Sequence, residues 1–479
     1  MLKRKLIAII ILATMIFSFV GCSDKESTDV IKNENVQDVD NDDESEDIDG
    51  NVDIPEEILD NESQTDQKQE LSMFTGKSKD LALQILDGDF TETMALFSSE
   101  MKRLISEDQL KQAWNLTTTD MGTFKALRSV TEEAKGSATL VYVILDYDIT
   151  GIQILFSYNA NKKINGLWFN YAPFETELMD NDFFEEANIS FGDKNNPIEG
   201  ILTLPKEVKN PPVAILVHGS GDHDADESIG VNKPFRDLAY GLANKGVAVI
   251  RYKESSSRKA KEEYTIQDDS LYDAAEAIKY ALSCGKVDKD RIVLVGHSLG
   301  GMMAPKIAMD NIEVAGIVSL AGSPRRLEDI ILDQNSILLQ ADDSITDLQY
   351  RLYMARVKSE VDKVKKIKKS GSEVILGYPA SYWYSLNQID TPSLVKELDI
   401  PMFIAQGNDD FQVYADIDYV EWQGLLKDKD NVIFKLYDNL NHLFMESNSR
   451  MDTTEYNIKG NVSQILIEDL AKWILSIKD

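Results

Sequence analysis

A serine that could act as a nucleophile lies in the motif Gly296-His297-Ser298-Leu299-Gly300, directly after the apolar run Ile292-Val-Leu-Val. An amphipathic segment follows the motif, so the sequence predicts a strand, a sharp turn and a helix in succession. Such a turn exposes the serine hydroxyl in strained backbone geometry, and its glycines allow neighbouring backbone to pass closely. The motif by itself is a weak signal, but this setting predicts that Ser298 attacks a carbonyl carbon in acyl transfer.

A serine nucleophile needs a base for its proton and a third group that orients the base. The base is expected after the final strand of the sheet, where His442 follows the predicted strand at 432–437. The acid is expected after the preceding strand, at 402–405, where Asp409 and Asp410 are neighbours. Consecutive residues project in different directions, so only one of these carboxylates can face His442. The other histidines are predicted to pack near the site or to point away from the nucleophile: His218, His223 and His297.

Acyl transfer also needs hydrogen-bond donors where negative charge develops on the carbonyl oxygen. The first predicted donor is the backbone N–H of Leu299, because it directly follows the nucleophile. The second is expected in a loop after an earlier strand, and the glycine-rich turn at 217–221 ends the strand that begins at Val213. We therefore predict an oxyanion hole made by the N–H groups of Leu299 and Ser220.

These residues must be positioned by a sheet, and from about residue 187 the chain alternates apolar strands with helical segments. Continuous apolar strands of this kind indicate an α/β fold with a mainly parallel, doubly wound sheet. About eighty residues separate Gly322 from Pro401, which is too long for a plain loop and predicts an inserted helical cap at about 324–395. Within the cap, Tyr382 and Trp383 could line an acyl pocket or form the core of the cap, and both interpretations stay open.

The composition excludes several other classes of protein. The 479 residues include 50 basic and 82 acidic side chains, and the formal net charge of −32 argues against a nucleic-acid partner. Two cysteines exclude a disulfide framework and a four-thiolate zinc site. The four histidines form no H-E-x-x-H motif, so we expect neither a metal nor an organic cofactor.

The N-terminal segment predicts a signal peptide followed by a disordered tether. A basic start and a short apolar run over 1–21 are typical of a signal peptide and are too short for a spanning helix. Its end, Phe-Val-Gly-Cys22, resembles the bacterial lipobox, which implies a lipidated Cys22 and an extracytoplasmic protein anchored to the membrane. Residues 22–70 are acidic and lack aromatic side chains, so they predict a disordered tether. Calcium binding is the alternative for this segment, but the EF-hand glycine and glutamate are missing.

A small domain is predicted between the tether and the sheet. Apolar residues at helical spacing over 71–115 are followed by segments rich in β-branched and aromatic residues, which predicts helices and then an antiparallel meander. We therefore expect a small α+β domain over 71–172. It is similar to a small domain of unknown function found ahead of hydrolases in Gram-positive lipoproteins, which implies a nuclear-transport-factor-like cone. It contains no visible catalytic constellation.

Residues 187–479 resemble the α/β-hydrolase superfamily, specifically bacterial esterases near the serine-aminopeptidase and dienelactone-hydrolase branches. Four separated motifs carry the resemblance: HGSGDHDADESIGVNKPFRDLA, GHSLGG, GNDDFQV and LNHLF. The order Ser298, Asp410, His442 is that of the superfamily, and its G-x-x-D pattern selects Asp410 as the acid. The chain departs from related esterases at 253–257, where it reads Lys-Glu-Ser-Ser-Ser.

The resulting functional hypothesis is a serine hydrolase that cleaves carboxylic esters through an acyl-enzyme, with a small acyl ester as substrate. A peptidase or aminopeptidase on the same triad is the first alternative, because a triad does not distinguish esters from amides. A non-catalytic surface-binding lipoprotein on the same scaffold is the second alternative. The sequence makes no prediction for the oligomeric state.

Overall fold

A computed structural model describes residues 61–119, 121–174, 177–254, 264–341, 345–449 and 452–477. The predicted signal peptide, Cys22 and most of the predicted tether lie outside these residues. The tether was predicted to continue to residue 70, but helix α2 (Asn61–Leu86) already begins at Asn61. Its polar first turns contain Gln, Glu and Lys, which are good helix formers, so the helix extends N-terminally from the part that is packed against the protein.

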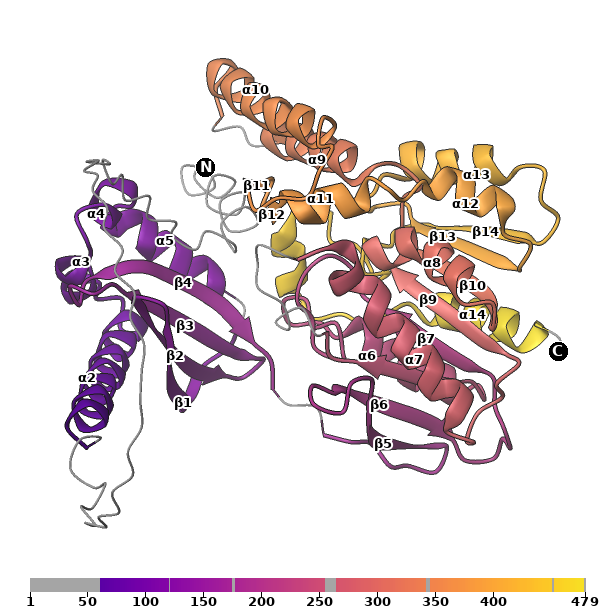
Figure 1. The fold of residues 1–479 in the computed structure, drawn as a ribbon, viewed down its shortest axis with the longest axis horizontal. Helices are drawn as coiled ribbons and strands as arrows, with labels where there is room; N and C mark the ends of the chain where they lie inside the picture. The colour runs from indigo at the N-terminus through magenta and orange to yellow at the C-terminus, as the bar shows by residue number, and fades with distance from the viewer. Residues whose placement is uncertain are drawn as a thin grey trace, which may run out of the picture.

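The first folded part consists of helices followed by an antiparallel meander (Figure 1). Three short helices follow α2: α3 (Thr91–Leu96), α4 (Met101–Leu104) and α5 (Glu107–Thr118). The sheet then runs in the order β1 (Phe124–Lys135), β2 (Ala138–Tyr147), β3 (Gly151–Tyr158) and β4 (Ile164–Ala172). Alternate residues of β2 and β3 are buried against Leu81 and Ile85 of α2, so helix and sheet share one hydrophobic core.

The second part is built on an eight-stranded sheet with the order β14-β13-β10-β9-β7-β8-β6-β5. At one side of the sheet, β6 (Ile198–Pro205) pairs antiparallel with its neighbour β8, and the edge strand β5 (Phe184–Phe191) pairs antiparallel with β6. The other six strands are parallel to one another. Those six strands are β7 (Val213–Val217), β8 (Ala248–Tyr252), β9 (Ile292–His297), β10 (Val314–Leu320), β13 (Met402–Gly407) and β14 (Val432–Tyr437). The predicted mainly parallel α/β sheet is confirmed, and it begins three residues before the predicted boundary at 187.

Helices cover both faces of this sheet, which explains why the parallel strands are apolar along their whole length. In β9, Ile292 and Leu294 belong to one core, whereas Val293 and Val295 belong to the core on the other face. The first face is covered by α7 (Tyr272–Ser283), α8 (Leu299–Asp310) and α13 (Val420–Leu426). The second face is covered by α6 (Pro234–Ala243) and α14 (Gln464–Ser476).

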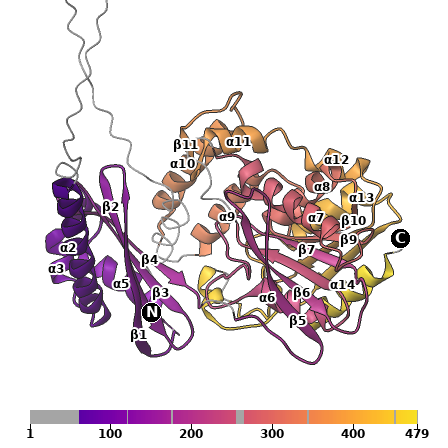
Figure 2. The same ribbon diagram turned by 60° about the horizontal axis from the view of Figure 1, so that its bottom comes forward.

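The predicted cap is present between β10 and β13. It contains the helices α9 (Leu327–Ala341), α10 (Asp347–Val364), α11 (Ala380–Leu386) and α12 (Thr391–Glu397), with the short hairpin β11 (Val374–Ile375) and β12 (Tyr378–Pro379). Figure 2 shows the cap over one end of the eight-stranded sheet and the β1–β4 sheet to its side. The two parts of the chain touch where the Tyr171 hydroxyl lies 2.6 Å from Oδ1 of Asn457.

Candidate active site

The turn at Ser298 has the strained geometry that its sequence predicts. Ser298 lies between β9 and α8 with φ 52° and ψ −115°, a backbone conformation that a residue with a side chain rarely adopts. A Cβ atom at Gly296 would collide with the backbone of Gly300, and one at Gly300 would collide with the backbone of Val217. The two glycines are therefore required by close backbone approach, and the serine is held at the end of a central strand.

The predicted base and acid are brought together by the next strands of the sheet. Nδ1 of His442 lies 2.7 Å from Oδ2 of Asp410, and both side chains are buried. The carboxylate can only accept, so Nδ1 carries a proton, and in the neutral ring this leaves a lone pair on Nε2. A lone pair at Nε2 is what a base needs to take a proton from a serine.

Asp410 is itself held in place by several donors. Its Oδ1 accepts the backbone N–H groups of Gln412 and Val413, at 2.8 and 3.0 Å, and Oδ2 also accepts Nε2 of Gln406 at 2.8 Å. The neighbouring Asp409 is partly exposed, and its backbone N–H donates to Leu440. The structure thus brings Asp410, and not Asp409, to the imidazole.

The Ser298 side chain is half-buried, and it has no hydrogen-bond partner among the described residues. Nε2 of His442 is likewise without a partner in that part of the chain. Catalytic hydrogen bonds are often long in the absence of substrate and shorten in the substrate complex. The turn at Ser298 is nevertheless hydrogen-bonded to the sheet, because the Ser298 N–H donates to the carbonyl of Leu320 at 2.8 Å.

The predicted oxyanion loop passes beside the nucleophile. A Cβ atom added at Gly219 would lie 3.2 Å from Cβ of Ser298, so this loop and the turn at Ser298 are in contact at this point. Leu299 is the first residue of α8, where backbone N–H groups lack partners within the helix. Leu299 directly follows Ser298, and the loop that contains Ser220 contacts the turn at Gly219. The oxyanion hole made by the N–H groups of Leu299 and Ser220 stays a prediction.

The remaining histidines do not compete for the role of base. His218 is fully buried against Phe235 and Tyr252, and its Nε2 donates to the carbonyl of Asp224 at 3.1 Å. Burial lowers the pKa of His218 to about 3, so this ring is neutral at physiological pH. His223 stays close to its own loop, with Nε2 3.1 Å from the carbonyl of Ser220.

The pocket-lining interpretation of Tyr382 and Trp383 is wrong. Both side chains are 0% exposed and belong to the core that lies beneath the cap. The Trp383 indole N–H donates to the carbonyl of Ile375 at 2.6 Å, and the Tyr382 hydroxyl donates to Asp269 at 3.3 Å. Their polar ends are used inside the protein: the Tyr382 bond joins the cap to the body of the domain, and the Trp383 bond lies within the cap.

Two kinds of supporting residue were not predicted from the sequence. Gln406 is the polar residue near the end of the apolar strand β13, a position that could have suggested a role, and it donates to Asp410. Glu227 and His297 form a buried pair behind the site, with 3.0 Å between Nδ1 and Oε2. Glu227 lies within the motif HGSGDHDADESIGVNKPFRDLA, but no local pattern shows that it pairs with His297, which follows it by 70 residues.

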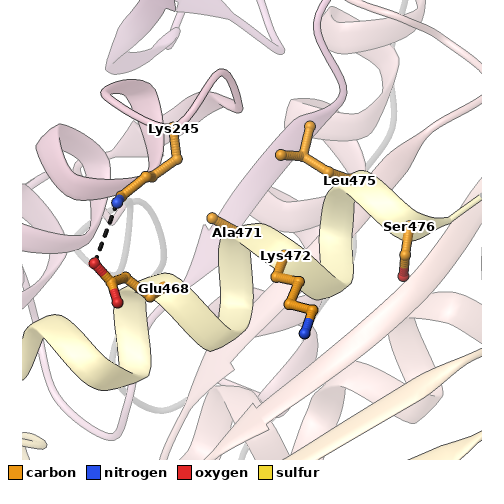
Figure 3. A pocket seen from close by; sticks show the side chains of 6 residues that line it. All are labelled: Lys245, Glu468, Ala471, Lys472, Leu475 and Ser476. Carbon is orange, nitrogen blue, oxygen red and sulfur yellow. Dashed lines mark hydrogen bonds and ion pairs between the residues drawn. The ribbon is translucent and has the colours of Figure 1, made fainter.

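Sites of other kinds are not apparent in the described ranges. No group of three or more His, Cys, Asp or Glu residues there is arranged to hold a metal ion, and no helix there is long and apolar enough to cross a membrane. A surface pocket of about 610 Å³ lies between Lys245 and the C-terminal helix α14 (Figure 3). None of its lining residues is a predicted site residue.

A mainly parallel sheet, covered on both faces and carrying a serine in a strained strand-to-helix turn, defines the α/β-hydrolase class of fold. Comparisons with known proteins extend this assignment. Residues 214–452 match the alpha/beta hydrolase family, and residues 78–167 match a protein family of unknown function, DUF3887. The chain is 31% identical over 393 residues to Esterase EstD of Thermotoga maritima, with 81% of this chain and 92% of that protein covered. The chain belongs to the alpha/beta hydrolase family.

Two solved structures with low sequence identity are also similar. Est1E from Butyrivibrio proteoclasticus is 14% identical, with a TM-score of 0.40 and coverage of 60% of this chain and 97% of that chain. An acylaminoacyl peptidase of Pyrococcus horikoshii is 12% identical, with a TM-score of 0.41 and coverage of 74% and 56%.

Proposed function

We propose that this esterase-type α/β hydrolase cleaves carboxylic esters of small acyl substrates with a triad of Ser298, His442 and Asp410. The observation that carries the proposal is the 2.7 Å contact between Asp410 and His442. The strained turn of Ser298 is near this pair, because His297, the residue before Ser298, lies 3.0 Å from the carbonyl of His442. The similarity to Esterase EstD supports an ester as the substrate class.

The chemistry proceeds in two steps through an acyl-enzyme. Ser298 Oγ attacks the carbonyl carbon while its proton passes to Nε2 of His442, and the N–H groups of Leu299 and Ser220 stabilise the oxyanion. Collapse of this intermediate expels the alcohol, which takes the proton from the imidazolium. A water molecule then repeats the attack on the acyl-enzyme with the same base and releases the acid.

An ester panel read against an amide panel tests the substrate class. We expect the purified full-length protein to hydrolyse nitrophenyl esters, and to show no turnover of aminoacyl nitroanilides above the background of its Ser298→Ala variant. An amide is harder to cleave because its leaving group must be protonated, which needs a site adapted to that step. Faster turnover of aminoacyl amides than of esters would assign the protein to the peptidase alternative.

The proposal includes an extracytoplasmic location with a lipid anchor on Cys22. The basic start and short apolar run ahead of Cys22 support it. Removal of residues 1–21, which carry a charge of +3, leaves a chain with a net charge of −35. Such a chain has no electrostatic attraction to anionic lipid, so the anchor alone would hold it at the membrane.

We therefore expect Cys22→Ser to release the processed protein from membranes into the soluble fraction. The measurement is membrane fractionation of wild type and variant, with Cys284→Ser as the matched cysteine control that stays with the membrane. A processed Cys22→Ser protein that still sediments with membranes would require a different anchor.

A further inference from the structure

A second carboxylate–imidazole pair lies behind the candidate triad and is not used in the proposed chemistry. Glu227 is 0% exposed, and the backbone at this residue has φ 49°, so the side chain is held by a strained turn. Its Oε1 accepts the backbone N–H of Gly219 at 2.7 Å. Its Oε2 lies 3.0 Å from Nδ1 of His297. Glu227 thus joins the oxyanion loop to the residue that precedes the nucleophile.

The other nitrogen of His297 reaches the loop of the candidate base. Nε2 of His297 lies 3.0 Å from the backbone carbonyl of His442, and the two rings are 4.8 Å apart. A carbonyl oxygen can only accept a hydrogen bond, so Nε2 must carry a proton. An ionised carboxylate at Nδ1 also can only accept, so that nitrogen needs a proton as well. With Glu227 ionised, the two contacts are those of an imidazolium at His297.

The charges favour this state. Burial alone would raise the pKa of Glu227, but the charge of His297 and its hydrogen bond lower this pKa to about 2. Burial likewise opposes the charge on His297, but Glu227 and the carbonyl of His442 raise the pKa of this imidazole. The other titratable groups that act on the pair are His218 and His223 near Glu227, and Asp410 near His297. Both shifts favour the ionised pair.

Water cannot readily replace these contacts. A cavity of about 10 Å³ beside Glu227 and His297 is otherwise lined by apolar residues and Pro234, among them Phe235, Leu320 and Phe444. This volume is at the lower limit for a single water molecule. Removing one partner of a buried ion pair leaves an uncompensated buried charge and strongly destabilises the folded protein. The pair therefore holds the loop of Glu227 and the loop of His442 in one arrangement.

We propose that Glu227 and His297 are positioning residues, which fix the oxyanion loop and the loop of His442 relative to Ser298. Glu227 holds Gly219, directly before the predicted donor Ser220, and His297 holds the backbone of the predicted base. The inference rests on the proposed function, because it assigns these loops to the oxyanion hole and the base. The new element is that the Glu227–His297 pair links the predicted oxyanion loop to the loop of His442.

The test compares Glu227→Ala with Glu227→Gln in the full-length protein. The alanine variant loses both contacts, and we expect kcat to fall on the order of 10²-fold, the scale of a lost oxyanion donor. KM should change by less than about threefold, because the positioned groups act on the transition state. Glutamine can still accept from Gly219 and donate to a neutral His297, so Glu227→Gln should recover kcat to within about tenfold of wild type.

The control is Glu328→Ala, which removes another buried glutamate, in the cap, whose ion-pair partner is Arg326. This variant should lose thermal stability with kcat unchanged. The rate of labelling by a serine-directed phosphonate is a second readout, and it should fall in Glu227→Ala and recover in Glu227→Gln. Wild-type kcat and labelling in a folded Glu227→Ala protein, or a glutamine variant as slow as the alanine one, would overturn the proposal.

Histidine-selective ¹⁵N NMR covers the case in which Glu227→Ala does not fold. The chain has four histidines, and the His297 signal is assigned by its loss in His297→Gln. Nε2 of His297 should carry a proton at neutral pH, because it donates to the carbonyl of His442, and an Nε2 without a proton would overturn the proposal. A wild-type protein that is labelled by the phosphonate but cleaves no ester would instead reject the proposed substrate class, while the labelling rates of the variants still decide the positioning role.

Discussion

Replacing Ser298 with alanine is expected to abolish phosphonate labelling and to lower ester turnover on the order of 10⁴–10⁶-fold. The reason is that the hydroxyl forms the covalent bond in the proposed acyl-enzyme, and removing the nucleophile leaves only the oxyanion donors and substrate binding. The fold should be unaffected. The hydroxyl has no hydrogen-bond partner among the described residues, and alanine has the same Cβ atom in the same strained turn.

The measurement combines labelling, ester kinetics and a thermal unfolding curve for wild type and variant. Ser283→Ala, which changes an exposed serine at the end of α7, is the matched control and should keep wild-type labelling. Labelling that persists in Ser298→Ala, at wild-type rate, would show that another residue reacts. Unchanged unfolding with lost labelling would assign the loss to chemistry.

The second large effect is expected from Asp410→Asn, with a loss in kcat on the order of 10²–10⁴-fold. Asparagine can keep Oδ1 on the N–H groups of Gln412 and Val413, so its amide nitrogen replaces the oxygen that faces His442. A donor at that position favours the ring tautomer with its proton on Nε2. That tautomer has no lone pair for the proton of Ser298, so the base is lost while the geometry stays close to wild type.

The neighbouring Asp409→Asn is the control for this variant and should stay within about tenfold of wild-type kcat. Asp409 is partly exposed, and none of its side-chain contacts in the described structure reaches the imidazole. Kinetics of both variants at neutral pH decide between the two carboxylates. If Asp409→Asn lost activity while Asp410→Asn kept it, the acid of the triad would be Asp409 and not Asp410.

The fold class was predictable because its signals are local. Strands buried on both faces must be apolar at every position, and this makes β7 and β9 visible as continuous runs in the sequence. The turn at Ser298 has a local signal as well, since the close approach of Gly296 to Gly300 and the strained Ser298 lie within five residues. The pairing of Asp410 with His442 was also predictable in outline, because adjacent parallel strands end at the same edge of a sheet.

The boundary of the tether and the burial of the cap aromatics were not predictable in this way. The polar start of α2 resembles a disordered segment in composition, and its helical state depends on the packed turns that follow. Tyr382 and Trp383 have side chains that suit a pocket wall and a core equally well. Their place depends on Asp269 and Ile375, which lie in other segments and accept their hydrogen bonds.

By itself, the sequence determined the α/β class, the strand-to-helix turn at Ser298 and the candidates for base and acid, because periodicity and glycine chemistry act over a few residues. Only the tertiary structure decided where the aromatic side chains of the cap lie and that Glu227 and His297 form a pair. These depend on contacts between different segments of the chain, and His297 follows Glu227 by 70 residues. Such contacts form when the sheet brings the ends of its strands together, so no local pattern in the sequence records them.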